Sequence, residues 1–454
     1  MYSIMRHVLN SRIHTDRLFS LGSAKRKGVA LIVTFLAICS CKHSINEIGN
    51  DSFTDDGVLK TGVIDRFYTA EPADRIQLYV ETSGSMNGLF RARKSNAFKT
   101  DMSAFLLKNA SNIIGVKAFT DGSTNLKSYS ANSFREYMND GSFVSSMNTE
   151  VPKMLQVILN DLKDGQCDVA VFVSDMKYSP KGGSATALGQ YALDIETMFG
   201  NHKDYSVCVI GFESEFLAAN GKIACDFFPY YMLVIGEGPK VSYVRNLILS
   251  ELERNGHVQG YIDFNQSYGC PYYSVLPIHG VFGGLRPNPN EFAASSNNGM
   301  YHSLLGYSML PDSEFIVAIR EQHLPWDIYK SIDASSFEVK STVTGMPIPF
   351  EVLEEEPSMR SSEDAMVKKC VQPSHYLKVQ PKDILFGTDV ISIRLIDKEA
   401  DVSWIQKYYG AQREEELDKT FSIDSFIEGL SNAYRKGRKL QEEPMLVLIS
   451  TATE

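Results

Sequence analysis

The sequence predicts an α/β fold with a doubly wound, mainly parallel sheet, followed by a second domain that is rich in β-structure. Between residues 73 and 263, apolar runs with strand spacing alternate with runs of helical spacing, as in a sheet covered by helices. From residue 307 to 454, short alternating runs separated by turn residues indicate an antiparallel sandwich, Ig-like or related. The length of 454 residues favours at least two domains over one core.

Composition narrows the class of protein. The chain is 43% apolar and 22% charged, which is normal for a globular protein and excludes bulk disorder. Its net charge of −10 argues against nucleic acid as the main partner, because phosphate binding needs a basic face. The cysteines after Cys41 show no CxxC pair and no zinc spacing, and a disulfide among Cys225, Cys270 and Cys370 stays open.

The N-terminus has the features of a targeting segment. Basic residues 25–27 precede an apolar run at 28–38, which is short for a membrane-spanning helix. The run ends in Ile38-Cys39-Ser40-Cys41, which resembles a bacterial lipobox. The resemblance implies a signal peptide over residues 1–40, a lipidated Cys41, and a lipid-anchored protein of the cell envelope, in the periplasm or at the outer-membrane surface. An uncleaved signal anchor or an ordinary secretory signal is the alternative.

The polar stretch that follows, residues 41–72, is rich in Asn, Asp, Ser and Gly. We expect it to be a tether between the membrane and the first domain.

The elements of the first domain follow from periodicity. Residues 169–173 form a continuous run of mostly β-branched residues, as expected for a strand buried on both faces of a parallel sheet. Residues 151–162 carry a clear amphipathic helical pattern with Pro152 in the first turn. The full prediction has strands at 76–80, 113–119, 168–174, 205–212 and 230–235, and helices at 98–108, 151–162, 185–199 and 241–252.

The most informative motif follows the first strand. After Leu78-Tyr79-Val80 the chain continues Glu81-Thr82-Ser83-Gly84-Ser85, which places one carboxylate and two hydroxyls at alternating positions at the carboxyl end of a strand. Ligands of α/β sheets bind at this edge, and hard oxygen ligands suit Mg²⁺. The pattern resembles the Asp-x-Ser-x-Ser motif of von Willebrand factor type A domains, where it forms the metal-ion-dependent adhesion site.

That resemblance covers about 190 residues and extends to two further positions, Thr149 and Asp175. By the logic of the family, Ser83 and Ser85 contact the ion directly, Thr149 contacts it directly or through water, and Glu81 and Asp175 act mostly through bound waters. The implied ion is Mg²⁺, or Mn²⁺ or Ca²⁺, with one position open for a carboxylate of a protein partner.

Two residues depart from the family pattern. Glu81 stands in place of the usual Asp, which moves the carboxylate by about one bond length, roughly 1.5 Å. Met176 stands where glycine is common after the Asp. The alternative to a working metal site is therefore a relic of the fold, in which the hydroxyls cap a helix and the carboxylate binds backbone amides.

We therefore expect a binding protein that acts in adhesion or assembly, and not an enzyme. A metal-free interaction scaffold that uses the same face is the alternative within binding. An envelope hydrolase with Asp175 or Glu81 as general base is less favoured, because the sequence shows neither a paired acid nor a nucleophile motif.

The second half resembles no family that we can name. Residues 264–306, rich in Gly, Pro, Asn and aromatics, indicate an irregular crossing between the domains. Beyond it, the sequence predicts strands at 315–320, 337–343, 349–353, 376–379, 390–396 and 445–449, and a helix at 423–436.

Overall fold

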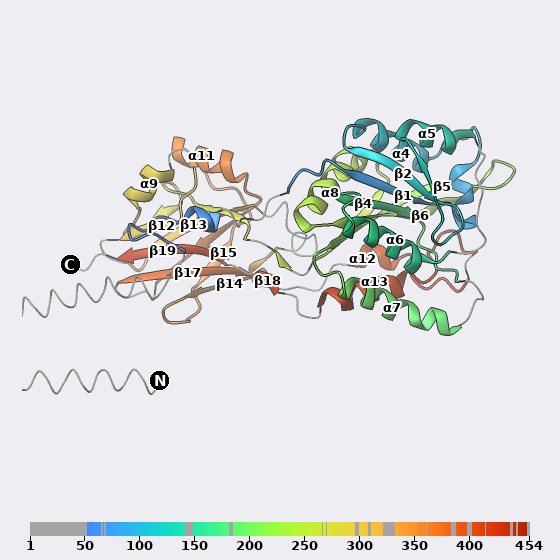
Figure 1. The fold of residues 1–454 in the computed structure, drawn as a ribbon. Coiled ribbons are helices and arrows are strands. Elements are labelled where there is room, and N and C mark those ends of the chain that lie inside the picture. The colour runs from blue at the N-terminus through green and yellow to red at the C-terminus, as the bar shows by residue number, and fades with distance from the viewer. Residues whose placement is uncertain are drawn as a thin grey trace, which may run out of the picture.

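The computed structural model forms an α/β body around a seven-stranded sheet, here called the large body, and a β-rich body built on two five-stranded sheets (Figure 1). This mixed α/β content with additional, mainly antiparallel sheets agrees with the predicted class at that level. The structure describes residues 52–451 except for internal gaps at 65–66, 68–69, 141–148, 181–184, 266, 269, 296–298, 307–309, 321–331, 360, 383–386, 397–401, 414, 436–438 and 442–443. The predicted signal peptide and Cys41 lie outside the described residues.

The sheet of the large body has the strand order β3-β2-β1-β4-β6-β5-β7. Its strands are β1 (Ile76–Glu81), β2 (Ile113–Phe119), β3 (Leu126–Tyr129), β4 (Val169–Ser174), β5 (Ser206–Leu217), β6 (Ile223–Gly236) and β7 (Val258–Phe264). Among the described strands of this sheet, β1 alone forms parallel pairs, with β2 and with β4.

The prediction of a mainly parallel sheet does not hold for the remaining pairs, which are antiparallel. For β5 and β6 the reason is their short connection. The two strands follow each other in the chain and are joined by a short turn, which allows only an antiparallel pair. The hairpin folds back so that β6 enters the sheet between β4 and β5.

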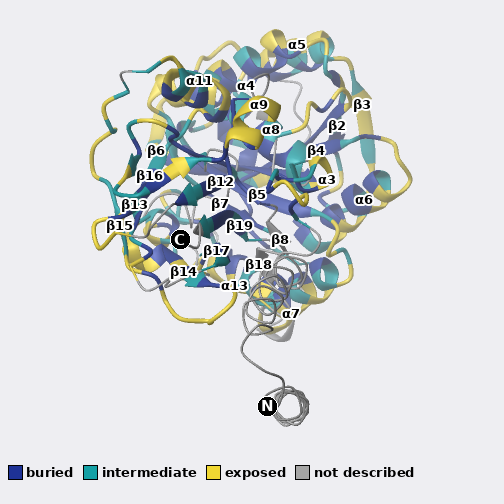
Figure 2. Cartoon of the chain, turned by 90° about the vertical axis from the view of Figure 1, so that its left-hand side faces the viewer, coloured by how far each residue is buried: buried dark blue, intermediate teal, exposed yellow. Residues whose placement is uncertain are grey.

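Helices cover both faces of this sheet. On β1, Leu78 and Val80 belong to one apolar cluster and Tyr79 to the other, because successive side chains of a strand point to opposite faces. One face carries α4 (Ala97–Lys108), α5 (Ala131–Asp140) and α8 (Gly238–Leu252), and the other carries α6 (Val151–Lys163), α7 (Ala185–Gly200) and α13 (Ile423–Arg435). Figure 2 shows mostly buried strands in the interior and exposed residues on the outer sides of helices and turns.

The β-rich body encloses one apolar cluster between its two sheets. One sheet contains β10 (Val281–Phe282), β13 (Glu314–Arg320), β16 (His375–Val379) and β15 (Phe350–Val352), with β9 (Tyr272–Val275) also paired to β13. The other contains β11 (Leu285–Pro287), β12 (Ser303–Gly306), β19 (Met445–Thr451), β17 (Thr388–Leu395) and β14 (Phe337–Ser341). Among its described residues, α9 (Pro289–Ser295) and α11 (Ser362–Val371) are helical. The pair β12–β19 is parallel, and the other pairs are antiparallel.

Residues 52–67 differ from the expected tether where the structure describes them. Phe53, Leu59, Val63 and Phe67 are buried in the cluster of the β-rich body, and α3 (Thr61–Ile64) forms part of this segment. Four apolar side chains at irregular spacing within a polar stretch are enough to fix the chain onto a surface of the fold. The N-terminal segment is therefore a structural part of the β-rich body.

The segment 402–435, here called the return segment, leaves the β-rich body after β17 and packs on the large body. Its helix α12 (Ser403–Gln406) lies against β7, and α13 lies along α7. Gly429 of α13 fits closely, since a Cβ there would lie 2.6 Å from Ala192 O of α7. The predicted helix at 423–436 is thus present, and it completes the apolar core of the large body.

Short strand pairs join the two bodies where the chain crosses between them. β8 (Ser267–Tyr268) leaves the large body and pairs in parallel with β18 (Lys439–Gln441), which follows α13. Phe67 forms an isolated bridge with Cys270 in the same region. Each body is therefore assembled from segments that are distant in sequence.

Candidate functional site

Strand β1 brings Glu81 to the interior of the molecule. Every residue of β1 is buried, and Glu81, its last residue, is 0% exposed. The chain then enters the 3₁₀-helix η2 (Gly84–Phe90), which carries Ser85 in its first turn. The hydroxyls of Ser83 and Ser85 lie 2.8 Å apart and hydrogen-bond to each other. The motif therefore forms a compact group at the carboxyl end of β1.

Hydroxyls from two other segments of the chain hold the Glu81 carboxylate. Thr149, which comes just before α6, donates to Glu81 Oε1 at 3.0 Å. Ser174, the last residue of β4, donates to Glu81 Oε2. The structure thus joins Glu81 to the predicted Thr149 and adds Ser174, which the sequence analysis did not single out. The sequence feature that could have indicated Ser174 is its position at the end of the apolar run of β4, directly before Asp175.

Asp175 lies beside this group and is fully buried. Its Oδ1 accepts a hydrogen bond from Lys177 N at 3.2 Å. Its Oδ2 is buried and has no hydrogen-bond partner among the described residues. An unpaired buried carboxylate oxygen is rare and energetically unfavourable, and it requires a functional or structural explanation.

The backbone after Asp175 takes an uncommon conformation. Met176 has φ of 57°, in the left-handed region that favours glycine. This is the position at which the resemblance leads one to expect glycine. The Met176 N–H donates to Ser174 Oγ at 2.7 Å and the side chain is fully buried, which offsets the backbone strain.

The two carboxylates influence each other. Burial, and next the charge of Asp175, raise the pKa of Glu81 to about 8, although the hydroxyls of Ser174, Ser83 and Thr149 favour its charged form. Burial also raises the pKa of Asp175, against the lowering effects of the Lys177 ammonium and of the Ser85 hydroxyl. The unliganded site is therefore expected to hold a proton at neutral pH.

Lys177 connects the site to the return segment. Its side chain is almost completely buried, its Nζ donates to Glu416 O at 2.7 Å, and it lies 5.1 Å from the centre of the Phe228 ring. Nearby, the hydroxyls of Tyr231 and Thr420 hydrogen-bond to each other at 3.0 Å. Residues 416–420 thus contact the same sheet edge as Asp175, although more than 200 residues of sequence separate them.

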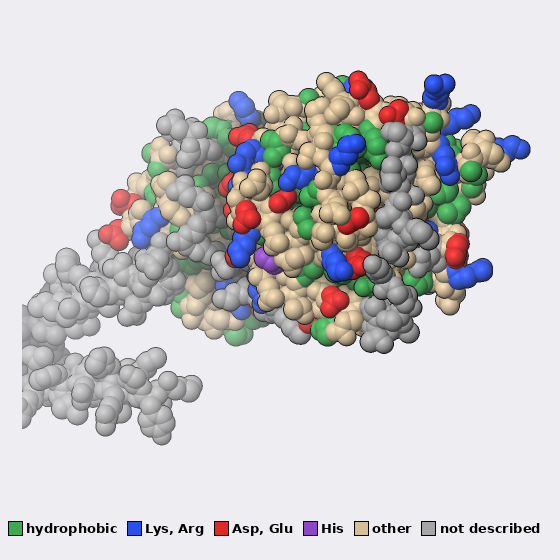
Figure 3. All heavy atoms as spheres, turned by 45° about the vertical axis from the view of Figure 1, so that its right-hand side comes forward, with side chains coloured by type: hydrophobic (Ala, Val, Ile, Leu, Met, Phe, Trp, Pro, Cys, Tyr) green, Lys and Arg blue, Asp and Glu red, His purple; other side chains and the backbone are tan. Residues whose placement is uncertain are grey.

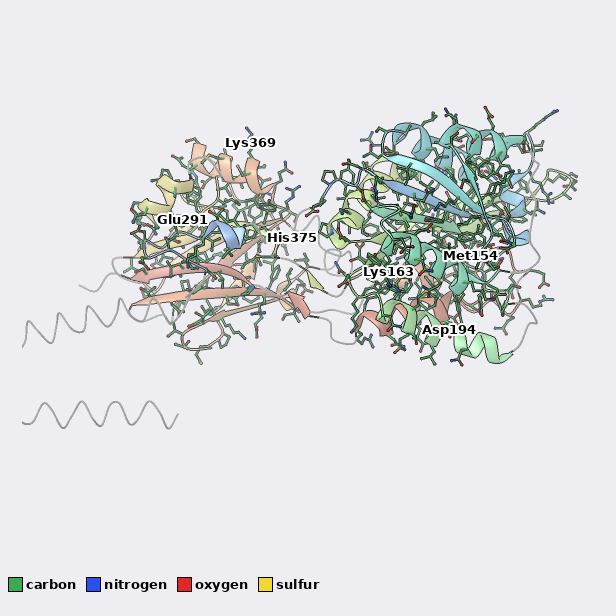
Figure 4. The ribbon with its side chains drawn as sticks, viewed as in Figure 1. Met154, Lys163, Asp194, Glu291, Lys369 and His375 are labelled. Atoms are coloured by element: carbon green, nitrogen blue, oxygen red, sulfur yellow. The ribbon has the colours of Figure 1, made fainter. Side chains whose placement is uncertain are left out.

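Further loops complete the surroundings. Thr149 and Ser179 form an isolated antiparallel bridge with two backbone hydrogen bonds of 2.9 Å, which joins the loop before α6 to the loop after β4. Glu150 N donates to Gly122 O in the loop after β2. Figure 4 shows Met154, in the first turn of α6, farther from the β-rich body than Lys163 near the other end of that helix. The site therefore lies at the end of the large body remote from the β-rich body.

The predicted ligands lie at the same end of the sheet. Glu81 is the last residue of β1, Ser83, Ser85 and Asp175 follow β1 and β4, and Thr149 precedes α6. As metal ligands these five residues offer two carboxylates and three hydroxyls. Among the described residues, no group of three or more His, Cys, Asp or Glu side chains is arranged to hold a metal ion. Any ion held here would depend on hydroxyl oxygens, partner groups and water.

Within the part of the chain that the structure describes, no helix has the length and apolar character needed to span a membrane. Comparisons of this chain with protein-family models, with curated proteins and with solved structures found no match.

Proposed function

We propose that this chain is a lipid-anchored protein of the cell envelope that binds a protein partner through a divalent cation, at the end of the large body that carries Glu81 and Asp175. In this proposal the large body is related to von Willebrand factor type A domains. The parallel core β2-β1-β4 with helices on both faces supports that relationship. For the β-rich body we propose a two-sheet sandwich; the parallel pair β12–β19 departs from an Ig-like arrangement that is antiparallel throughout.

The unpartnered Oδ2 of Asp175 carries the proposal. A buried carboxylate oxygen without a donor is stabilised by a cation, and the neighbouring Ser83 and Ser85 hydroxyls supply hard oxygen ligands. These groups fit Mg²⁺ or Mn²⁺ in donor type. Ser83, Ser85 and Asp175 would hold the ion, with Thr149 and Glu81 at its margin.

Calorimetric titration of Mg²⁺ and Mn²⁺ tests the metal site, using the full chain with Cys41→Ser so that the predicted lipidation site is removed. We expect saturable binding that is lost in Asp175→Asn and in Ser83→Ala. The matched control is Asp168→Asn, just before the opposite end of β4, which should bind as the parent does. The titration extends to millimolar ion, because an open site that lacks its partner ligand binds weakly. Absence of binding there would overturn the metal-dependent proposal.

A metabolic label tests the anchor. A bacterial host that expresses the full chain should incorporate a clickable palmitate analogue, and Cys41→Ser should abolish incorporation. Label in the Cys41→Ser protein would show that the lipid is attached at another residue.

Lys177 favours a second candidate, a metal-free interaction scaffold. Its ammonium is buried two residues after Asp175, and its charge stabilises the Asp175 carboxylate. In this alternative the ammonium takes the place of the ion. The variant Lys177→Met separates the two: tighter Mg²⁺ binding than the parent supports a metal site in which Lys177 competes, whereas a destabilised protein that binds no ion supports the scaffold.

An envelope hydrolase has less support from the geometry. Both oxygens of Glu81 accept hydrogen bonds from hydroxyls, and the residue is fully buried. A general base must reach the proton of a substrate or water, and this arrangement directs Glu81 toward the protein.

A further inference from the structure

The hairpin of β5 and β6 extends beyond the rest of the sheet. Pairing of β6 with β4 ends at Tyr231 and Ser174, and pairing of β5 with β7 ends at Phe212 and Val258. Residues 214–228, here called the outer hairpin, therefore pair only with each other in the sheet. Figure 1 shows its light-green turn projecting from the end of the large body remote from the β-rich body. This is the end that carries the candidate site.

The outer hairpin is fixed to the element that carries Ser85. Gly88 of η2 lies under the Phe216 ring, and a Cβ there would come within 2.6 Å of the ring atoms. Arg91, at the end of η2, donates from Nε to Leu217 O at 3.2 Å. The Phe216 and Phe228 rings lie 4.7 Å apart across the hairpin. The projection is therefore held in a defined position next to the site.

Two large apolar side chains of the outer hairpin face solvent. Phe227 is 64% exposed and Ile223 is 55% exposed, and Phe227 is the most exposed large hydrophobic residue among those described. An exposed aromatic side chain on a rigid projection has the character of an interface anchor, since aromatic residues dominate binding energy when they enter a partner.

Basic side chains lie at the turn of the outer hairpin and in the loop after η2. Lys222 lies in the hairpin turn, and Arg93 and Lys94 lie in the loop after η2; all three are exposed. Lys94 reaches the turn, since a Cβ on Gly221 would lie 3.1 Å from Lys94 Cε. None of the three forms an ion pair with a described carboxylate. Figure 3 shows Lys and Arg side chains gathered at this end of the molecule.

Charge then identifies the kind of partner. The whole chain carries a net charge of −10, so a local group of cations that form no ion pair among the described residues stands out from the average surface. Three carboxylates oppose this charge: Glu215 is engaged by Ala97 N at 2.9 Å, Asp226 on the hairpin is exposed, and Asp418 of the return segment acts on Cys225 of the hairpin. Such a patch attracts an acidic surface and repels basic ones.

We propose that the outer hairpin and the loop 91–94 form a docking surface for an acidic protein segment that carries apolar side chains, which contact Ile223 and Phe227. The inference deepens the proposed function, since it shares the idea that this end of the large body binds a partner, but it does not require the metal ion.

The test measures binding of a fluorescein-labelled peptide that alternates Glu with Leu and Phe, by anisotropy, to the full chain with Cys41→Ser. The first variant is Ile223→Ser with Phe227→Ser, and the second is Lys94→Glu with Lys222→Glu. The matched control is Leu107→Ser with Lys108→Glu at the far end of α4, where an exposed Leu and Lys also lie side by side. We expect each hairpin variant to weaken binding by about tenfold or more, and the control to leave binding unchanged.

Two comparisons make the test decisive. A peptide with Gln in place of Glu should bind more weakly, and vesicles of phosphatidylcholine and phosphatidylglycerol in equal parts should not compete. Equal binding to all variants, no saturable binding of the acidic peptide, or preferential binding to the vesicles would each overturn the inference. Titrations in Mg²⁺ and in EDTA separate the two proposals. Hairpin-dependent binding in EDTA supports the surface without the ion, and ion-dependent binding that ignores the hairpin supports only the metal site.

Discussion

The Thr149 hydroxyl donates to Glu81 Oε1 at 3.0 Å and thereby joins the loop before α6 to the end of β1, 68 residues earlier in the chain. Both residues are buried, so the bond stabilises the protein as well as shaping the site. Replacement of the hydroxyl by a methyl group leaves one buried carboxylate oxygen with one donor fewer.

Thr149→Val should therefore lower the free energy of unfolding by about 1–3 kcal/mol. The measurement is urea denaturation in the absence of divalent ions. Thr124→Val, at an exposed position in the loop after β2, is the control and should change stability by no more than about 0.5 kcal/mol. Equal effects of the two substitutions would show that the bond to Glu81 contributes nothing.

The raised pKa of Glu81 gives the metal-free protein a defined pH dependence. The folded protein keeps on Glu81 a proton that the unfolded chain loses above about pH 4.5, until the pH passes the folded-state pKa of about 8. The free energy of unfolding should therefore fall between these two pH values, by an amount on the order of a few kcal/mol.

Thermal unfolding in EDTA across this pH range checks the sign. Glu81→Gln, which keeps a neutral side chain, should show a flatter dependence than the parent, whereas Glu428→Gln on the exposed side of α13 should not. Parallel curves for the parent and Glu81→Gln would refute the assignment.

The contact between α13 and α7 predicts opposite effects for two glycine substitutions. Gly429→Ala should destabilise the protein by about 1–3 kcal/mol, because the added methyl meets Ala192 O at 2.6 Å. Gly189→Ala, at an exposed position of α7 where a Cβ would meet nothing within 4 Å, should stabilise it by up to about 1 kcal/mol. Differential scanning calorimetry measures the stability of both variants. If Gly429→Ala left stability unchanged, the helices would be able to move apart at no cost in stability.

The N-terminal segment predicts where the chain tolerates truncation. Removal of residues 1–51 gives the reference protein, which keeps every residue that the structure describes. Removal of residues 1–72 also deletes Phe53, Leu59, Val63 and Phe67, each of which contributes about 1.5–3 kcal/mol by burial. The longer truncation should therefore unfold at a clearly lower denaturant concentration and expose the β-rich core to limited proteolysis. Indistinguishable unfolding of the two truncated proteins would restore the tether interpretation.

The sequence predicted the elements with strong local patterns. Strands β1 and β4 match the prediction within one residue, because a strand that is buried on both faces is a continuous apolar run. The candidate residues lie close together in the structure, because the carboxyl ends of the parallel strands β1 and β4 lie side by side; their role as metal ligands stays a prediction.

Other features depend on contacts that no local pattern encodes. The apolar run of β6 is the same for a parallel or an antiparallel neighbour, so its place between β4 and β5 was not predictable. The amphipathic pattern of α13 indicates an apolar face but not the surface of α7 that it covers. Lys177 was missed because its role depends on Glu416, which only the return segment brings to the site.

The route of the chain has a consequence for its biosynthesis. A domain made of contiguous residues can fold as soon as it leaves the ribosome. The large body cannot, because Phe426 and Leu430 of α13 complete its core only after β9 to β17 have been translated. The β-rich body in turn waits for β19, near the last residues. The cores of both bodies therefore stay incomplete in the nascent chain until α13 and β19 have been synthesised.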